Sequence, residues 1–366
     1  MLSTFWSPSE LQLLVGTTLA PAVTSKLKSL QREYNQLCAS AARTRWYRFV
    51  QEHIALDDWM QVDAMFRSRA LDFYGSCMIP GMDLASHAAG DKTNAFYDRA
   101  DDKYYLWLSE DKNLSAGQEV NISYGDEKGA CEMLFSYGFL DDEMATAGTV
   151  FLSLSISNDD VAKTAKMKIA GCAPGFKIID IPVDKGSESA VEAGEAHSTP
   201  ANDQESSFSG VGWKGSFVWL CCVNHDDGLR FELVNTVDGH EELRATFNGQ
   251  ELHGADELPC LLAQTYMWPV YRLRAVVVLQ QRVFDQLQVL YCTQEEIETV
   301  SHGDASDIRE TPYQQAMQLR RLEFGLLEKA YEEFERQKLR LAESAVVQQY
   351  LTSITADQSA QGEDCS

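Results

Sequence analysis

Two tyrosine-glycine pairs, Tyr124-Gly125 and Tyr137-Gly138, lie in the segment 117–142, GQEVNISYGDEKGACEMLFSYGFLDD. Each glycine lets the backbone turn sharply just after a phenol. A pair of phenols ringed by apolar side chains can hold an amine. The alternative is that both are ordinary core tyrosines whose hydroxyl groups have found partners.

The elements around these tyrosines decide whether they can meet. Residues 119–124 alternate polar and apolar side chains as a strand does, and residues 132–135 are helix formers. A strand and a short helix on either side of a turn can fold the two phenols toward one pocket. The sequence therefore predicts that Tyr124 and Tyr137 share a site.

The N-terminal part of the chain has helical periodicity. Ser7, Pro8 and Glu10 form a helix start, with a serine N-cap and a glutamate that can reach back to its amide. Apolar residues then recur at three- and four-residue steps to about residue 70. From residue 77 to 124 short apolar pieces are separated by turns, which predicts a small, irregular β region.

The remainder of the chain mixes strands with long helices. A polar, Ser/Gly-rich stretch, residues 184–212, is predicted to be a flexible insertion, and residues 357–366 a disordered tail. The expected strands are residues 149–156, 176–183, 216–223, 229–234 and 243–247. The expected helices are residues 258–288, with a kink at Pro269, and residues 314–350.

Composition limits the possible partners. The formal net charge of -24, without a clustered basic stripe, argues against direct binding to a nucleic-acid backbone. An acidic surface would attract a basic protein, although acidity also serves solubility alone. The 45% hydrophobic content over 366 residues is enough for two folded domains.

The cysteines and the hydropathy pattern indicate the compartment. The nine cysteines lack metal-ligand spacing, so reduced thiols and no bound metal are expected. No run of about twenty apolar residues occurs, and the N-terminus does not have the pattern of a signal peptide. We therefore expect a cytoplasmic or nuclear protein that does not bind a membrane.

Three short pieces of sequence together resemble a known family. They are Ser68-Arg69-Ala70, then Asp83-Leu-Ala-Ser86-His87, and then the GQEVNISYG segment followed by Tyr137-Gly-Phe139. In order and spacing they resemble the second half of a SET domain of the Rubisco large-subunit methyltransferase type. That family transfers a methyl group from S-adenosylmethionine to a lysine side chain of a protein.

The resemblance implies an α+β fold with a particular domain order. Residues 1–145 would form a partial SET domain, in which residues 7–65 are a helical insertion and residues 66–145 the second half of the domain. Residues 146–356 would form a mainly helical substrate-binding domain with some strands.

The resemblance also implies roles for single residues. Tyr124 matches the tyrosine between the methyl donor and the amine, and Tyr137 matches a second tyrosine of the lysine channel. Arg69 and Asp83 match the residues that hold the carboxylate and amino groups of S-adenosylmethionine. Ser86 and His87 match cofactor-binding positions near the adenine side.

Two departures from the family pattern affect the cofactor site. Ser86 stands where most members have asparagine, and serine has fewer hydrogen-bond donors. The first SET strands, with their Gly-x-Gly turn, are not found before the helices. The sequence therefore predicts a SET domain without its N-terminal part, and weak or undetectable binding of S-adenosylmethionine.

Different functions remain open at this point. The first is methyl transfer to a lysine of a basic protein, for instance a ribosomal or translation protein. The second is a non-catalytic scaffold derived from a SET methyltransferase, which binds a partner through its acidic C-terminal region. A third is methylation of histidine in a wider channel.

Overall fold

The computed structural model describes all residues except 74, 126–127, 182–209, 236–239, 304–307 and 364–366. The chain divides into two compact units. The first unit comprises Met1–Gly148 and Cys292–Glu323, and the second comprises Thr149–Tyr291 and Phe324–Ser366. Both contain helices and small sheets, so the predicted α+β class is confirmed.

The first unit begins with helices and continues with short strands. Its helical elements are η1 (Ser3–Phe5), α1 (Pro8–Gln12), α2 (Leu19–Ala41), α3 (Tyr47–His53), α4 (Leu56–Arg69), η2 (Met82–Leu84), η3 (Gly90–Lys92) and α5 (Ala130–Ser136). Its strands are β1 (Leu71–Asp72), β2 (Ser76–Cys77), β3 (Ser86–His87), β4 (Ala95–Ala100), β5 (Lys103–Leu108) and β6 (Asn121–Ile122).

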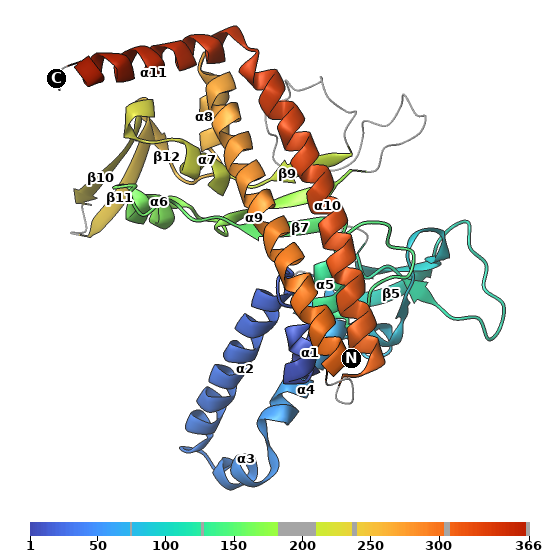
Figure 1. The fold of residues 1–366 in the computed structure, drawn as a ribbon. Helices are drawn as coiled ribbons and strands as arrows, with labels where there is room; N and C mark the ends of the chain where they lie inside the picture. Colours follow the sequence, from blue (N-terminus) through green and yellow to red (C-terminus); the bar gives the residue numbers. More distant parts are fainter. Residues whose placement is uncertain (74, 126–127, 182–209, 236–239, 304–307, 364–366) are drawn as a thin grey trace. The chain divides into compact units, whose positions relative to one another are not determined.

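The helices before residue 70 form an arm of the first unit. Ser7 and Glu10 make the predicted capping box at the start of α1. In Figure 1, α2 runs along the arm, α3 lies at its tip and α4 returns beside α2. Lys26 of α2 pairs with Asp63 of α4 at 2.5 Å, which fastens the two helices together. The predicted helical layer is thus present as separate helices.

The strands of the first unit determine where segment 117–142 lies. β4 and β5 form an antiparallel hairpin, whereas β3 and β6 pair in parallel. The register of β3 and β6 sets His87 beside Ile122. Because Tyr124 follows β6 directly, this pairing holds Tyr124 next to the Asp83–His87 segment.

The second unit contains two antiparallel sheets. Its strands are β7 (Thr149–Ser153), β8 (Gly175–Asp180), β9 (Val211–Lys214), β10 (Leu229–Asn235), β11 (Glu241–Phe247) and β12 (Gln250–Leu252). Its shorter helices are α6 (Lys163–Ile169), α7 (Phe217–Cys222), η4 (His225–Asp227) and α8 (Leu258–Ala263). The long helices α9 (Trp268–Gly303) and α10 (Glu310–Ala342) contribute residues to both units, and α11 (Ala345–Glu363) follows.

Two expectations for the second unit were wrong. Residues 216–223 were expected to form a strand, but Phe217–Cys222 is the helix α7, with its residues buried on several sides. A short apolar run does not distinguish a strand from a fully buried helix. Pro269 does not kink a helix, because it lies in the first turn of α9, where proline is well tolerated.

The predicted insertion and tail are only partly within the described residues. Residues 182–209, most of the expected insertion, lie outside them. The backbone helix α11 extends to Glu363, through much of the segment expected to be a tail. Among the described residues, no helix combines the length and apolar character needed to cross a membrane.

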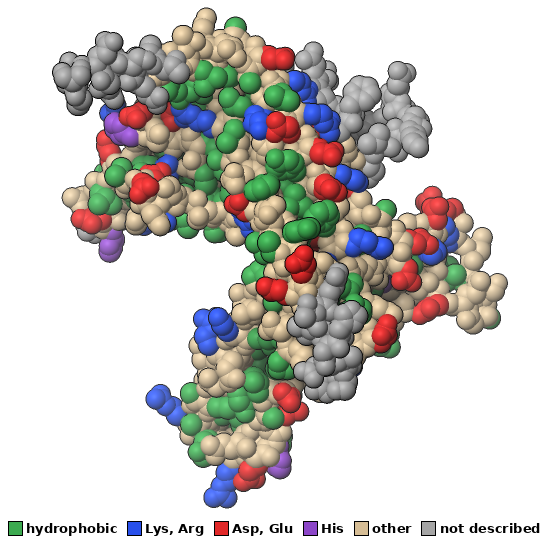
Figure 2. All heavy atoms as spheres, in the orientation of Figure 1, with side chains coloured by type: hydrophobic (Ala, Val, Ile, Leu, Met, Phe, Trp, Pro, Cys, Tyr) green, Lys and Arg blue, Asp and Glu red, His purple; other side chains and the backbone are tan. Residues whose placement is uncertain are grey.

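The surface shows how the charges are distributed. On the face drawn in Figure 2, acidic and basic side chains are interspersed, and basic side chains do not gather into a continuous stripe.

Candidate functional site

Tyr124 and Tyr137 face each other in the first unit. The centroids of their rings are 4.6 Å apart and the ring planes meet at 42°. Tyr124 follows β6, and Tyr137 follows the last residue of α5, whose buried residues Ala130, Met133 and Leu134 fix the helix against the core. The structure thus brings together the two phenols that the sequence placed in one pocket.

Both glycines after these tyrosines have backbone conformations that favour glycine. Gly125 has φ +130° and Gly138 has φ +77°. A Cβ atom at Gly138 would also lie only 2.8 Å from the carbonyl carbon of Met1. Gly138 is therefore required both by its φ angle and by the close approach of the N-terminal backbone.

The two hydroxyl groups bond within the site. The Tyr124 hydroxyl donates to the carbonyl oxygen of Ala85 at 2.8 Å, and the Tyr137 hydroxyl lies 3.2 Å from the carbonyl oxygen of Tyr124. The Lys128 ammonium donates to the Tyr137 hydroxyl at 2.5 Å. Burial is the main cause that raises the pKa of Tyr124, with a further contribution from Tyr137. Tyr124 is therefore a neutral hydrogen-bond donor near neutral pH.

A pocket of about 100 Å³ opens between these phenols and the end of α4. Arg69, Asp83 and Lys128 supply its charged groups together with Asp72. The other lining residues are Ser68, Ala70, Leu71, Met82, Ala85, Tyr97, Ile122, Ser123, Tyr124 and Tyr137. Residues from separate segments of the sequence therefore converge on one cavity.

Arg69 and Asp83 contact each other only loosely. Their closest side-chain atoms, Nη1 and Oδ2, are 4.0 Å apart, and Nη1 lies 3.5 Å from the Asp83 carbonyl oxygen. Asp83 accepts a hydrogen bond from the Gly81 amide at 2.9 Å. Because strong charge-assisted hydrogen bonds are shorter than 3 Å, both groups keep capacity for a further partner of opposite charge.

His87 and Ser86 do not line this pocket. His87 accepts a hydrogen bond at Nδ1 from the Tyr124 amide at 3.1 Å, and its ring centroid lies 5.1 Å from that of Tyr124. Its Nε2 is 3.7 Å from Asp141. The Ser86 hydroxyl donates to Glu119. His87 thus holds the backbone of Tyr124 from outside the pocket. The cofactor-binding roles predicted for Ser86 and His87 stay predictions.

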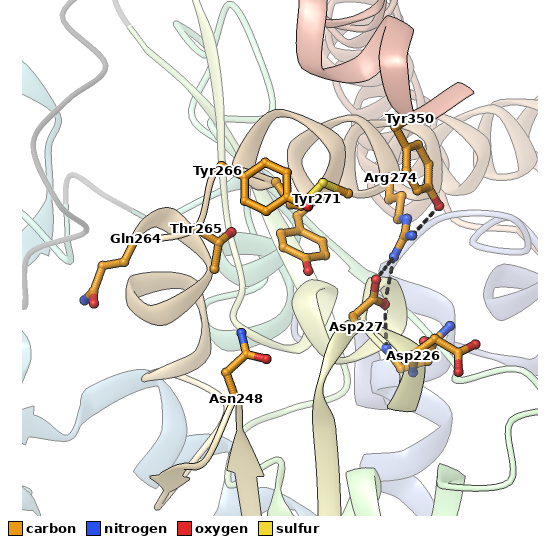
Figure 3. Close-up of a pocket in the computed structure, with 11 residues that line it drawn as sticks. Asp226, Asp227, Asn248, Gln264, Thr265, Tyr266, Tyr271, Arg274 and Tyr350 are labelled. Carbon is orange, nitrogen blue, oxygen red and sulfur yellow. Dashed lines mark hydrogen bonds and ion pairs between the residues drawn. The ribbon is translucent and has the colours of Figure 1, made fainter. Parts of the chain in front are cut away.

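The second unit holds a larger cavity, of about 720 Å³, beside the start of α9 (Figure 3). At its centre, Arg274 donates to both oxygens of Asp227 at 2.8 Å and to the Tyr350 hydroxyl at 2.5 Å. Arg274 also donates to the Cys222 carbonyl oxygen at 3.1 Å. The other labelled residues on its wall are Asp226, Asn248, Gln264, Thr265, Tyr266 and Tyr271.

The fold of the chain is similar to that of solved SET-domain structures. A structure of the SET domain of LSMT bound to lysine and AdoHcy has a TM-score of 0.61 with 19% identity, over 95% of this chain and 71% of that one. A structure of Rubisco LSMT bound to AdoMet has a TM-score of 0.58 with 18% identity, over 93% of this chain and 68% of that one.

Sequence comparison agrees with the fold. The chain is 28% identical over 280 residues to SET domain-containing protein 8 of Schizosaccharomyces pombe, covering 75% of this chain and 57% of that protein. It is 28% identical over 177 residues to the Rubisco large-subunit N-methyltransferase of Pisum sativum, covering 45% of this chain and 36% of that protein. No family model matches. The chain thus spans just over half the length of the first relative, and the predicted resemblance is confirmed.

Sequence reasoning missed Lys128 and the Arg274 cluster. Lys128 lies between the two tyrosine-glycine pairs, but residue type and spacing do not indicate that its ammonium group bonds to the Tyr137 hydroxyl. The partners of Arg274 are 47 and 76 residues away in the sequence, so no local pattern joins them.

Proposed function

We propose that this protein transfers a methyl group from S-adenosylmethionine to a lysine side chain of a basic protein. The observation that carries the proposal is the convergence of the paired phenols of Tyr124 and Tyr137 with Arg69 and Asp83 on one pocket. Among the solved structures of similar fold, one binds AdoMet and another binds lysine and AdoHcy.

The charged groups of the pocket fit the amino-acid end of S-adenosylmethionine. Arg69, with 41% of its side chain exposed, can pair with a carboxylate, and Asp83 can accept from an ammonium group. Their loose mutual contact supports this assignment, because neither group is saturated by the other. When bound, S-adenosylmethionine supplies a methyl group that its sulfonium already activates.

The tyrosines would hold and orient the acceptor amine. Methyl transfer needs a neutral amine that is aligned with the donor and kept from water, and it does not require a general base at the reacting nitrogen. A poorly solvated channel disfavours the ammonium form of an entering lysine and so favours its deprotonation. Tyr124 would form one wall of that channel. Its hydroxyl group is held by the Ala85 carbonyl oxygen, and its backbone amide is held by His87.

The partner and the strength of cofactor binding are finer parts of the proposal. The net charge of -24 supports a basic protein as the acceptor, in the cytoplasm or nucleus. We expect weak cofactor binding because Ser86 replaces the usual asparagine and is paired with Glu119. A saturating concentration of S-adenosylmethionine is therefore part of the assay.

The experiment measures labelled methyl transfer from S-adenosylmethionine to a lysine-rich basic protein. We expect Tyr124→Phe to lower transfer roughly 100-fold, the size found for losing one oriented catalytic hydrogen-bond donor. Binding of the basic protein should be nearly unchanged. Tyr105→Phe is the matched control, because Tyr105 stacks on Trp107 and does not line the pocket.

Two results would count against methyl transfer at this site. Equal losses of transfer and of partner binding in Tyr124→Phe would contradict the role of Tyr124. Binding of the basic protein by the wild-type chain without any transfer would favour the non-catalytic scaffold instead.

A further inference from the structure

The phenol-lined pocket already contains an amine, and it comes from the chain itself. The Lys128 Nζ atom donates to the Tyr137 hydroxyl at 2.5 Å and lies 4.9 Å from the centroid of the Tyr137 ring. At these two distances Nζ lies beyond the hydroxyl edge of the ring, so the hydrogen bond is the contact that holds it. Lys128 therefore occupies the Tyr137 hydroxyl, to which an incoming lysine would bond.

Gly125 makes room for the Lys128 side chain. A Cβ atom at Gly125 would lie 3.1 to 3.2 Å from three carbon atoms of the Lys128 stem. The Lys128 amide also donates to the Gly125 carbonyl oxygen at 3.2 Å. The same glycine that follows Tyr124 thus leaves the space in which the stem of the lysine side chain lies.

Among the described residues, the ion pair of Lys128 does not explain its position. Its carboxylate partner there, Glu132, is 4.0 Å from Nζ and has 49% of its side chain exposed. An exposed pair at this distance contributes little. The contact with Tyr137 is much shorter, so the phenol holds the amine. With 30% of its own side chain exposed, Lys128 can also leave toward solvent.

We propose that Lys128 is an internal amine ligand of the tyrosine pocket, which a substrate lysine must displace before it can bind there. This inference rests on the proposed function, because it takes the pocket to be the site that receives a lysine. Lys128 thereby sets a threshold: an acceptor lysine binds only if the rest of its protein contributes enough affinity to displace the internal amine.

The test compares binding to the cofactor-free chain of lysine whose α-amino and carboxyl groups are blocked. Blocked norleucine, which lacks the ε-amine, is the control ligand. Lys128→Met should bind blocked lysine about fivefold to tenfold more tightly than the wild type, the size expected for one competing hydrogen bond. Lys92→Met is the control variant, because Lys92 is exposed and pairs with Glu143 at 2.5 Å.

The outcomes separate this inference from the proposed function. Equal affinity of wild type and Lys128→Met for blocked lysine, above that for norleucine, would overturn the internal ligand and leave the lysine site standing. No preference for lysine over norleucine in either chain would overturn both.

A second measurement reads the position of Lys128 directly. After reductive ¹³C-methylation of the lysines, the Lys128 resonance is identified by its loss in Lys128→Arg. We expect it to be shifted by the Tyr137 ring and to return to the position of exposed lysines in Tyr137→Leu. A Lys128 resonance at the exposed position in the wild-type chain would contradict the inference, whatever the binding result.

Discussion

The pockets of the two units use similar residue types in opposite ways. In the second unit, Arg274 is bonded to both oxygens of Asp227 at 2.8 Å and to Tyr350 at 2.5 Å. In the first unit, Arg69 and Asp83 approach each other only to 4.0 Å between their side chains. Arg274 in the larger cavity thus has several close hydrogen-bond partners within the protein, whereas the charged groups of the smaller pocket are only loosely paired.

This difference distinguishes closely bonded charges from loosely paired ones. Donors that are already bonded within the protein are not available to a ligand, and removing one partner of such a buried pair is costly. Loosely paired charges at the edge of a pocket contribute little to stability but can bind a charged molecule strongly. If volume alone were used to choose the candidate functional site, the cavity of the second unit would be chosen.

The largest effect on stability is expected from Arg274→Met. Asp227, with 9% of its side chain exposed, would lose its cation, and the Tyr350 hydroxyl and Cys222 carbonyl would lose a donor. We expect the free energy of unfolding to fall by about 2 to 4 kcal/mol, as for breaking a buried ion pair. Urea unfolding measures it, with Arg244→Met at an exposed pair as control. A change comparable to that of the control would contradict the structural role of Arg274.

Glu10 and Glu323 are buried carboxylates of the first unit, and they differ in whether an arginine bonds to them. Arg309 donates to Glu10 through Nε and Nη2 at 2.7 Å, and these hydrogen bonds lower the Glu10 pKa from 4.5 to about 2. Glu323 accepts from the Thr18 amide at 3.0 Å, but burial raises its pKa to about 7. Their contributions to stability therefore depend on pH with opposite signs.

The predicted pH dependence follows from these directions. Because its pKa is lowered on folding, Glu10 stabilises above pH 4.5, and this contribution is lost as the pH falls toward 2. Because its pKa is raised, Glu323 favours the folded state below pH 4.5, and this contribution is lost as the pH rises toward 7. In Glu10→Gln, the loss of free energy of unfolding between pH 4.5 and 2 should be smaller by about 1 to 2 kcal/mol. This value is reduced because the partner arginine is exposed to solvent.

Thermal unfolding of the wild type and the two glutamine variants across this pH range checks both signs. Glu323→Gln should remove the decline between pH 4.5 and 7 and leave the acid limb in place. An unchanged acid limb in Glu10→Gln would contradict the stabilising role assigned to the Arg309 pair.

The smallest effect on stability is expected from Arg69→Met. Arg69 is 41% exposed, and among the described residues its ion pair is the one with Asp83 at 4.0 Å, so the free energy of unfolding should change by less than about 0.5 kcal/mol. Urea unfolding of this variant beside Arg274→Met gives the comparison directly. A loss as large as that of Arg274→Met would show that Arg69 belongs to the structural framework.

Local patterns in the sequence predicted the site better than they predicted its surroundings. The glycines after Tyr124 and Tyr137 indicate turns, and residues 132–135 between them are helix formers. The meeting of the two phenols therefore follows from residues that are near each other in the sequence. The apolar run of α7 gave the wrong element, because burial on several sides removes the periodicity that separates helix from strand.

The remainder depends on contacts between distant residues. The Arg274 cluster joins three elements far apart in the sequence, and Lys128 reaches a hydroxyl group that lies beyond a further helix. The structure groups residues 292–323 with the first compact unit, and the domain boundaries expected from the sequence stay a prediction. None of these features has a local signal in residue type or spacing.

The most direct test of the central claim is a calorimetric titration of S-adenosylmethionine into the wild-type chain and into Arg69→Met. We predict weak but saturable binding by the wild type, and an affinity at least about tenfold lower in the variant, as expected for losing a hydrogen bond to a charged group. The folded state of the variant should be unaffected. Equal affinities of the two chains would contradict the assignment of this pocket to the cofactor.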